Sequence, residues 1–364
     1  EDGGITAFIV TPDMPGFRIV DPALRKVGYR GTHTTNLAFE NMEVPESNIL
    51  GAKGNGLRIC LTVLDFGRTT FGATCTGCAK YLVQRAQAHA IERRQFGQPL
   101  ATFPLVKQKL AEMAALVYAM DASTYLTAAL IDDGQNDIML ETAILKVFAS
   151  ESLWKILYDT MQIFGGRSFF QTEPFERMMR DARINMIGEG SNDVLRVFIA
   201  AVGLREVGVA YKSLLESMKH PASAAGACAE ITRRLFRSVS KPKIPVQSGR
   251  LAPETGRLRR SIRRFSLSVL RLLLTYREAV AEDQLKLNRI AEGAISLYTA
   301  AAVLSKIDSR LQSGAPADAE LDTARLYCTL ALDRLEESLD HLRARNRDSE
   351  MEALSDRITG RRPS

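Results

Sequence analysis

The chain has 364 residues, and its 46% hydrophobic and 25% charged content is typical of a globular protein rather than a disordered or fibrous one. No apolar run reaches the roughly 18 residues that a membrane-spanning helix needs, and no signal-peptide pattern opens the chain. Five cysteines without a disulfide framework spacing predict a reducing compartment. The length suits two or three domains, and the strand-like start at Glu1 leads us to expect a fragment of a longer protein.

A partial antiparallel β domain is expected over residues 1–54. Ile5 to Val10 and Phe17 to Val20 are short strand-like runs between turn residues, and Thr34 to Val44 alternates with period two. The glycines between Gly51 and Gly56 mark a loop. They are not a dinucleotide-binding fingerprint, because no βαβ unit surrounds them.

From Leu57 onward the apolar residues recur at helical spacing almost to the end of the chain. Short loops between long helices predict a helical bundle over residues 55–219. Its five helices are expected at residues 57–94, 105–131, 137–164, 175–187 and 191–207. The fold class is therefore mainly α, with the β domain in front of the bundle and an extra helical domain behind it.

Cys75 and Cys78 form a Cys-x-x-Cys pair, which suggests a redox or metal site in other settings. Here the pair lies inside a helical pattern, with no second cysteine pair and no nearby histidine. Buried small apolar side chains are the favoured interpretation, and we predict no metal site.

A basic segment follows the bundle, at residues 220–256. Between Arg233 and Arg271 there are 12 Lys and Arg but one acid, so this stretch carries more positive charge than the +6 of the whole chain. A short basic amphipathic helix inside residues 224–243, followed by a Pro/Ser/Gly linker over 241–256, predicts peripheral contact with a membrane. A nucleic-acid site is ranked low, because no aromatic residues are interleaved with the basic ones.

A C-terminal helical domain is expected over residues 257–364. Leu258 to Tyr276 has four arginines near its start, and here we favour a solvated basic face on a packed helix over a membrane element. Two more helices are expected at Glu282 to Ser313 and at Asp318 to Arg343. The last residues look frayed.

The stretch at residues 183–193 organises the functional prediction. It is an apolar run that ends in Glu189, followed by Gly190 and two candidate helix caps, Ser191 and Asn192. Glu189 is expected in a turn between two helices, where apolar neighbours would make a carboxylate a stronger base. The N-terminus of the next helix would offer N–H donors to an anionic ligand. The alternative is that Glu189 is an ordinary surface turn residue.

This stretch resembles the catalytic segment of acyl-CoA dehydrogenases, in which Glu-Gly is followed by Thr or Ser. Three further segments resemble signatures of that family in the same order, at Leu64 to Arg68, Glu92 to Gly97 and Gln162 to Gly166. Lys26 to Thr32 resembles a turn of the family's β domain. The resemblance is closest to the very-long-chain branch, because the chain continues to Ser364. The family's first helical domain and early strands have no counterpart in this sequence.

The resemblance implies α,β-dehydrogenation of a long-chain acyl-CoA to the trans-2-enoyl-CoA, a step of fatty acid β-oxidation. Glu189 matches the base that takes the α proton, and its backbone N–H matches the donor to the thioester oxygen. The β hydride goes to flavin N5 of FAD. Asp65 and Arg68 match positions that contact the CoA, and Gly190 leaves room for the thioester. From the residues alone, Asp65 and Arg68 form an ion pair on one helix face.

The resemblance also implies which residues bind FAD. Arg93 matches an arginine that reaches the FAD diphosphate across a dimer interface, and a guanidinium suits phosphate because it is always charged and bidentate. The remaining FAD-binding positions are Gln95 and Phe96, then Gln162, Ile163, Phe164, Gly165 and Gly166 from the partner subunit, and Ser191, Asn192 and Asp193. From the residues alone, Arg93 is an exposed cation at a helix end, and Gly165-Gly166 stops a helix.

Two departures from the family pattern stand out. Gly188 precedes the base where the family usually has Phe or Tyr, which would enlarge the pocket beside Glu189. The residues after Gly166, Arg167 to Phe170, are bulkier than the small residues that the family tends to have there.

The implied partners are an acyl-CoA, an electron-transfer flavoprotein as electron acceptor, and a second copy in a homodimer. The implied location is the bacterial cytoplasm or the mitochondrial matrix, peripheral to the inner membrane. The alternative function is a non-catalytic family member that acts as a membrane-associated assembly protein. Glu189, Arg93 and Arg68 favour the enzyme, whereas the basic segment fits either function.

Overall fold

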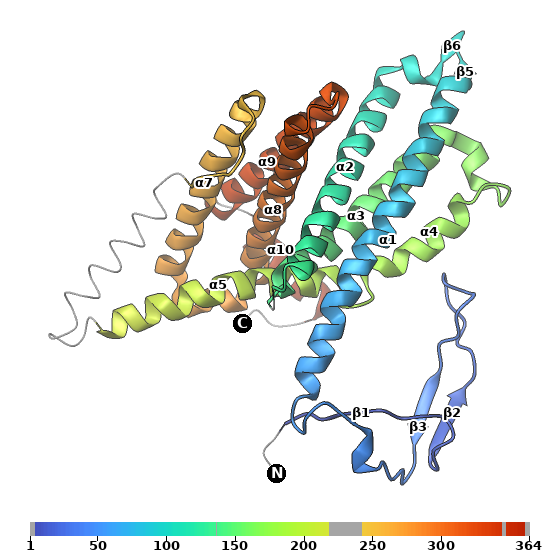
Figure 1. The fold of residues 1–364 in the computed structure, drawn as a ribbon, viewed down its shortest axis with the longest axis vertical. Helices are drawn as coiled ribbons and strands as arrows, with labels where there is room; N and C mark the ends of the chain where they lie inside the picture. The colour runs from blue at the N-terminus through green and yellow to red at the C-terminus, as the bar shows by residue number, and fades with distance from the viewer. Residues whose placement is uncertain (1–3, 136, 218–241, 344–346, 361–364) are drawn as a thin grey trace. The chain divides into compact units, whose positions relative to one another are not determined.

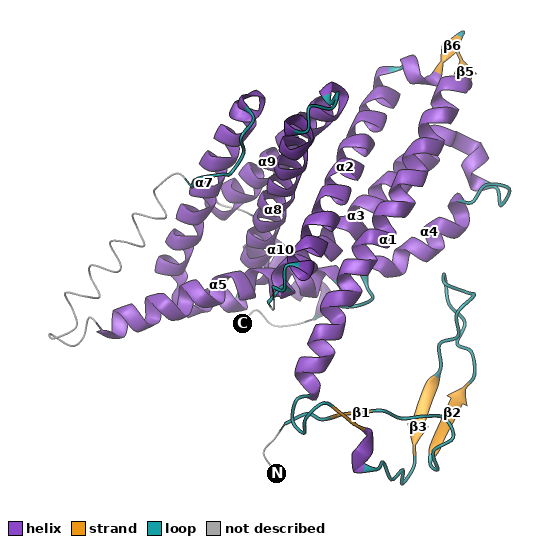
Figure 2. Cartoon of the chain, in the orientation of Figure 1, coloured by secondary structure: helices purple, strands orange, loops and turns teal. Residues whose placement is uncertain are grey.

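The computed structural model describes residues 4–135, 137–217, 242–343 and 347–360. Helices dominate this part of the chain, and its short strands pair antiparallel (Figure 2). The predicted fold class is therefore confirmed. The chain divides into two compact units, residues 1–106 with 149–190 and residues 107–148 with 191–364. The domain boundaries drawn from composition differ from this division and stay a prediction.

The strands that the structure describes all lie in the first unit, and each pairs with one neighbour. Phe17 packs edge-on against Phe39 with ring centroids 5.7 Å apart, which fixes the register of the longest pair. The pairs are β1 (Ala7–Phe8) with β4 (Ile49–Leu50), β2 (Phe17–Asp21) with β3 (Asn36–Phe39), and β5 (Arg94–Gln95) with β6 (Gln98–Pro99). In the first two pairs, β1, β2 and β3 confirm the expected antiparallel strands, whereas β4 was not expected. The third is a hairpin that no strand pattern in the sequence predicted.

The first unit is built on α1 (Gly56–Glu92), with the second half of α3 (Met139–Phe164) and α4 (Phe175–Arg183). Side chains buried at three- and four-residue spacing run along α1, and most of them are small or polar. The larger apolar residues that the periodicity placed on this face, Leu61, Leu64 and Phe71, are only partly buried. Cys75 belongs to this buried stripe. Cys78 is partly buried, and burial raises the pKa of its thiol, so the interpretation of the cysteine pair as packed side chains is supported.

The second unit contains most of α2 (Pro104–Asp132), the first half of α3, and the helices that follow Ser191. In Figure 1, α8 and α9 lie side by side, and their contact forms much of the core. The buried Tyr327 of α9 donates a hydrogen bond from its O–H to Thr299 Oγ1 of α8 at 2.7 Å. The later helices are α5 (Asn192–Ser217), α7 (Ala252–Tyr276), α8 (Gln284–Gln312), α9 (Asp318–Arg343) and α10 (Asp348–Thr359).

Several helix boundaries differ from the sequence-based expectation. The fourth helix ends at Arg183 and continues as a 3₁₀ turn, and α5 runs past its expected end near Val207. The linker expected to reach Gly256 is too long, because a 3₁₀ turn begins at Gly249 and α7 at Ala252. The sequence missed α10. This helix has no buried residue, so its sequence carries no apolar stripe to reveal it.

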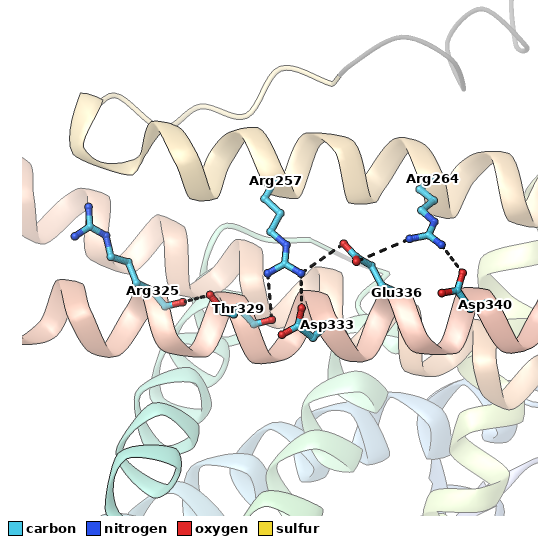
Figure 3. A network of polar contacts seen from close by, with 7 residues as sticks. All are labelled: Arg257, Arg264, Arg325, Thr329, Asp333, Glu336 and Asp340. Atoms are coloured by element: carbon cyan, nitrogen blue, oxygen red, sulfur yellow. Dashed lines mark hydrogen bonds and ion pairs between the residues drawn. The ribbon is translucent and has the colours of Figure 1, made fainter. Parts of the chain in front are cut away.

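The basic helix α7 packs against the acidic face of α9 through ion pairs (Figure 3). Arg257 Nη2 lies 2.5 Å from Asp333 Oδ1 and 3.5 Å from Glu336 Oε1, and Arg264 pairs with Asp340 farther along the two helices. Leu258 of α7 is buried. The favoured interpretation of Leu258 to Tyr276 as a packed helix is therefore confirmed.

Residues 218–241 contain most of the segment expected to contact a membrane (224–243), and they lie outside the described residues. Within the part that the structure describes, α2 and α8 are long and apolar enough to cross a membrane by length and composition alone, contrary to the expectation from the sequence. Half of the apolar window of α2 and 61% of that of α8 are buried inside the protein. Both helices therefore serve as core helices here.

The short helix α10 is attached to α8 by a bidentate ion pair. Asp348 accepts hydrogen bonds from Arg289 Nη1 at 2.7 Å and from Nη2 at 2.6 Å, and these bonds hold the pKa of Asp348 below its usual value. A group whose pKa is depressed in the folded state stabilises that state fully above the unfolded value, which is about 3.9 for Asp. The contribution is present at neutral pH and is lost as the pH falls below about 4.

We expect Asp348→Ala to release α10 at neutral pH, because no buried side chain of the helix replaces the ion pair. Amide hydrogen exchange in residues 349–359 should become faster, while α8 and α9 keep their protection. Glu350→Ala is the matched control, since Glu350 is the other acid in the first turn and is exposed. Unchanged exchange in the Asp348 variant would show that other contacts hold α10.

Candidate active site

Glu189 lies in a tight turn between two helical segments, as the sequence predicted. The N–H groups of Ile187 and Gly188 both donate to Ile184 O at 2.8 Å and end the preceding 3₁₀ turn. Glu189 then has a φ of +58° and Gly190 a φ of +96°. A left-handed conformation costs a non-glycine residue of the order of 1 kcal/mol, and such residues persist mainly where function or packing holds them.

Helix α1 passes directly beside the Glu189 carboxylate. A Cβ atom built on Gly67 would lie 2.8 Å from Glu189 Oε2 and 3.2 Å from Oε1. Because Gly67 has no side chain, the Glu189 carboxylate can occupy this space. The side chain of Glu189 folds back onto α1.

A buried arginine holds the main chain of the same turn. Arg68 Nε donates to Glu189 O at 3.4 Å, and Arg68 Nη1 lies 3.4 Å from Asp65 Oδ1. Both Arg68 and Asp65 are 7% exposed. The ion pair expected from their spacing is confirmed, and the structure adds the bond to the turn.

The other side of the turn is held by the loop at residues 26–32. The Tyr29 N–H donates to Asp181 Oδ1 at 2.6 Å, and the Tyr29 hydroxyl donates to Asn185 Oδ1 at 3.4 Å. Asn185 is buried, and its Nδ2 lies 3.6 Å from Cys75 Sγ of α1. This loop and α1 therefore both make hydrogen bonds to the segment that leads into Glu189.

The desolvation expected for Glu189 is not provided by the described residues. Glu189 is exposed, and so are the apolar Ile184 and Ile187 that precede it. The apolar run in the sequence predicted an environment for Glu189 that excludes water. In the structure, the side chains of Ile184 and Ile187 face solvent instead.

We expect Gly67→Ala to displace the Glu189 carboxylate without harming the fold. The new Cβ would force a flexible carboxylate end to shift, while alanine in place of a helical glycine stabilises by about 1 kcal/mol. The turnover number should fall several-fold and the melting temperature should not fall. Gly77→Ala is the control in the same helix, because a Cβ there meets no atom within 4 Å. Equal turnover in both variants would contradict the predicted role of Glu189 as the general base.

The start of α5 presents the predicted diphosphate-binding residues, in the second unit. Ser191 caps the helix, with the Val194 N–H 3.4 Å from Ser191 Oγ. Asn192, the other candidate cap, instead accepts a hydrogen bond at Oδ1 from Lys146 Nζ at 2.9 Å. Asp193 occupies the first turn, where the helix dipole favours an acid.

A hairpin after α1 carries the next set of predicted cofactor residues. Phe96 and Gly97 have φ angles of +53° and +80°, as the two-residue type I′ turn requires. Arg94 Nη2 donates to Gly97 O at 2.7 Å, and Arg93 and Gln95 are exposed. The Phe96 side chain is 92% exposed. Its ring meets the Phe103 ring edge-on, with centroids 6.3 Å apart.

The segment from Gln162 to Gly166 lies against the last turns of α1. The Phe164 ring stacks on His89 with centroids 4.1 Å apart, and Gly165 ends α3 with a φ of +60°. Burial lowers the pKa of His89, so the ring stays neutral at neutral pH. Ile163 and Phe164 are buried, whereas Gly165 and Gly166 are exposed and Gln162 is exposed as well.

Two buried groups escaped the sequence-based prediction. Glu173 is buried between Arg85 Nη2 at 2.7 Å and Arg167 Nε at 2.6 Å, and it fixes the turn after Gly166 against α1. Lys146, fully buried in α3, is the partner of Asn192. The signal for Lys146 was its position as a lone charge inside an apolar run.

The predicted residues of the first unit form two separate groups. Asp65, Arg68 and Glu189 lie together, whereas the hairpin and the segment beside His89 lie at the other end of α1. Residues 68 and 89 are about 30 Å apart along the helix, at about 1.5 Å per residue. One copy of this unit therefore does not bring all of its predicted residues to one place.

Two family domains match most of the chain. Residues 54–204 match the acyl-CoA dehydrogenase C-terminal domain, and residues 249–362 match the ACAD9/ACADV C-terminal domain. The human mitochondrial very long-chain specific acyl-CoA dehydrogenase is 33% identical over 346 residues, which is 93% of this chain and 53% of that protein. The probable acyl-CoA dehydrogenase FadE10 of Mycobacterium tuberculosis is 30% identical over 99% of this chain and 58% of its own length.

Solved structures agree with the sequence matches. An acyl-CoA dehydrogenase complexed with FAD from Bacillus anthracis superposes with a TM-score of 0.79 at 27% identity, over 99% of this chain and 62% of that chain. The butyryl-CoA dehydrogenase of Megasphaera elsdenii superposes with a TM-score of 0.53 at 34% identity, over 55% of this chain and 52% of that chain. The chain spans about half the length of the curated relatives that it matches. Together with the four motif segments, these matches show that the chain belongs to the acyl-CoA dehydrogenase family, close to its very-long-chain branch.

Proposed function

We propose that the protein catalyses FAD-dependent α,β-dehydrogenation of long-chain acyl-CoA thioesters to trans-2-enoyl-CoA, as in fatty acid β-oxidation. One observation supports this most strongly. The Glu189 carboxylate folds onto α1 at Gly67, while Arg68 holds the main chain of the same residue. A glutamate held at its side chain and at its main chain is suited to take a proton from one defined position.

Glu189 acts as the general base for the α proton of the thioester. Its backbone N–H donates to the thioester oxygen as that oxygen gains negative charge. Gly190, with its φ of +96°, keeps the main chain free of a side chain where the thioester lies. Asp65 and Arg68 bind the CoA portion and hold the turn.

The described residues fit FAD as the cofactor. FAD supplies the redox chemistry when bound, because its N5 atom accepts the β hydride. The capped N-terminus of α5 suits a diphosphate, since N–H donors and the positive end of the helix dipole meet the Ser191 hydroxyl there. Arg93 and the exposed Phe96 provide a cation and a ring at the hairpin.

The separation of the two groups of predicted residues in the first unit supports a homodimer. The hairpin and the segment beside His89 lie about 30 Å along α1 from Arg68. A second copy would supply the hairpin and this segment to the FAD beside Glu189. Arg93, Gln95, Phe96 and Gln162 to Gly166 would then bind a cofactor whose flavin serves the other active site.

The remaining parts of the proposal concern partners and location. The electron acceptor is an electron-transfer flavoprotein, and the solved structures that resemble this chain include one of an electron transferring flavoprotein of Acidaminococcus fermentans. The location is the mitochondrial matrix or the bacterial cytoplasm, since the relatives include mitochondrial and mycobacterial proteins. Residues 224–243 would contact the inner membrane through their basic side chains.

The test is the visible spectrum of the purified protein before and after addition of palmitoyl-CoA without an external acceptor. A flavin band that bleaches on addition of the substrate is the expected result, because the cofactor itself takes the hydride. Butyryl-CoA is the comparison for chain length and should bleach the band more slowly. A colourless protein, or a band that neither substrate changes, would contradict the proposal and favour the assembly role.

A further inference from the structure

A fully buried lysine lies beside the first residue of α5. Lys146 is 0% exposed, and its neighbours Leu145 and Val147 are buried as well. Residues 142–150 of α3 are buried on all sides of the helix, so the ammonium group cannot reach solvent by extending past them. Burial of a charge costs several kcal/mol unless hydrogen bonds compensate it.

One hydrogen bond of this lysine is directed at the catalytic segment. Lys146 Nζ donates to Asn192 Oδ1 at 2.9 Å, and Asn192 is 6% exposed. Asn192 follows Ser191 directly, and only Gly190 separates Ser191 from Glu189. A contact at residue 192 therefore restrains the residues proposed to bind the diphosphate.

The ammonium group of Lys146 lies close to the N-terminus of α5. A cation close to a helix N-terminus is repelled by the positive end of the helix dipole. A buried apolar side chain of similar size would avoid both the desolvation of the ammonium and this repulsion. An anion bound at the same helix end would favour a cation in this position.

We propose that Lys146 is a positioning residue, which fixes the first turn of α5 through Asn192 and thereby sets the affinity for the FAD diphosphate. This inference rests on the proposed function, since it takes FAD as the ligand of that turn. Lys146 touches neither substrate nor cofactor in this proposal. It acts through the Asn192 side chain and the backbone of residues 191–194.

The test compares three variants of the purified protein with the wild type. Lys146→Met removes the charge and the donor and keeps the length of the side chain. Lys146→Met with Asn192→Leu removes both members of the bond, so the Asn192 amide is not left buried without its donor. Lys155→Met is the matched control, because it is the same change on the same helix and breaks the bond from Lys155 Nζ to Asp159 Oδ2 (2.8 Å).

Three quantities are measured: the FAD dissociation constant by quenching of flavin fluorescence, the melting temperature without FAD, and amide exchange at residues 192–195. We expect both Lys146 variants to bind FAD about tenfold more weakly or worse. The double variant should regain the melting temperature lost in the single one, yet keep the weak affinity. The control should lower the melting temperature and leave the FAD affinity unchanged.

Two results would overturn the inference. FAD affinity that recovers together with the melting temperature in the double variant would show a purely structural lysine. Wild-type affinity in Lys146→Met would show no role at all. If the wild type binds no FAD, the proposed function fails. The positioning of α5 by Lys146 is then tested by amide exchange alone, and unchanged exchange at residues 192–195 in Lys146→Met would refute it.

Discussion

Glu189→Gln will abolish the bleaching of the flavin band by palmitoyl-CoA and leave the yellow colour of the protein intact. The amide keeps the size of the side chain but cannot accept the α proton. General base catalysis is worth about 10²- to 10⁴-fold, so the bleaching rate should fall by at least a hundredfold. Stopped-flow absorbance of the reduced and oxidised flavin measures it, and the FAD content and the melting temperature serve as checks on the fold.

Glu189→Asp extends the same test to the geometry of the site. The shorter side chain withdraws the carboxylate from Gly67, so we expect a rate between those of the wild type and the Gln variant. Glu43→Gln is the control, because Glu43 lies outside the proposed site and belongs to the loop after β3. Rapid bleaching in Glu189→Gln would exclude Glu189 as the base and would require another proton acceptor.

Arg68→Met will destabilise the protein and inactivate it together. Asp65 would remain buried without its arginine, and breaking a buried pair in this way costs about 3–5 kcal/mol. The bond to the Glu189 carbonyl is lost as well, so the base loses its restraint. Urea unfolding monitored by circular dichroism gives the free energy of unfolding, and steady-state kinetics give kcat/KM.

A second substitution separates the loss of stability from the loss of activity. Asp65→Leu with Arg68→Met removes both charges, so we expect most of the lost stability to return while kcat/KM stays low. Arg58→Met is the control on the same helix, because Arg58 is exposed. Activity that returns together with stability in the double variant would assign Arg68 a structural role only.

The sequence predicted the helices well because their signal is local. Apolar residues at three- and four-residue spacing located α1, α2, α8 and α9 nearly to their ends, and a glycine pair marked the end of α3. It failed at α10, since a helix that buries nothing has no periodic apolar stripe. The turn at Glu189 and the Asp65–Arg68 pair likewise followed from patterns within short stretches, and the fold class followed from the helical spacing along the whole chain.

The tertiary structure decided which distant residues meet. Arg68 and Glu189 lie 121 positions apart, and Lys146 and Asn192 lie 46 apart, so no periodicity in the sequence links them. Their meeting depends on how whole helices pack. The same holds for the arginines of α7. Their charge alone indicates a membrane or a solvent face, whereas in the structure Arg257 and Arg264 pair with acidic side chains of α9.

The sequence by itself thus determined most of the helices, the fold class, the family resemblance and the position of Glu189 in a turn. Only the tertiary structure showed that the carboxylate lies on Gly67, that Glu189 is exposed, and that a buried lysine holds the next helix. The physical reason is the range of the interactions. Backbone hydrogen bonds and apolar periodicity act over a few residues, whereas burial and ion pairing depend on segments that are remote in sequence and close in space.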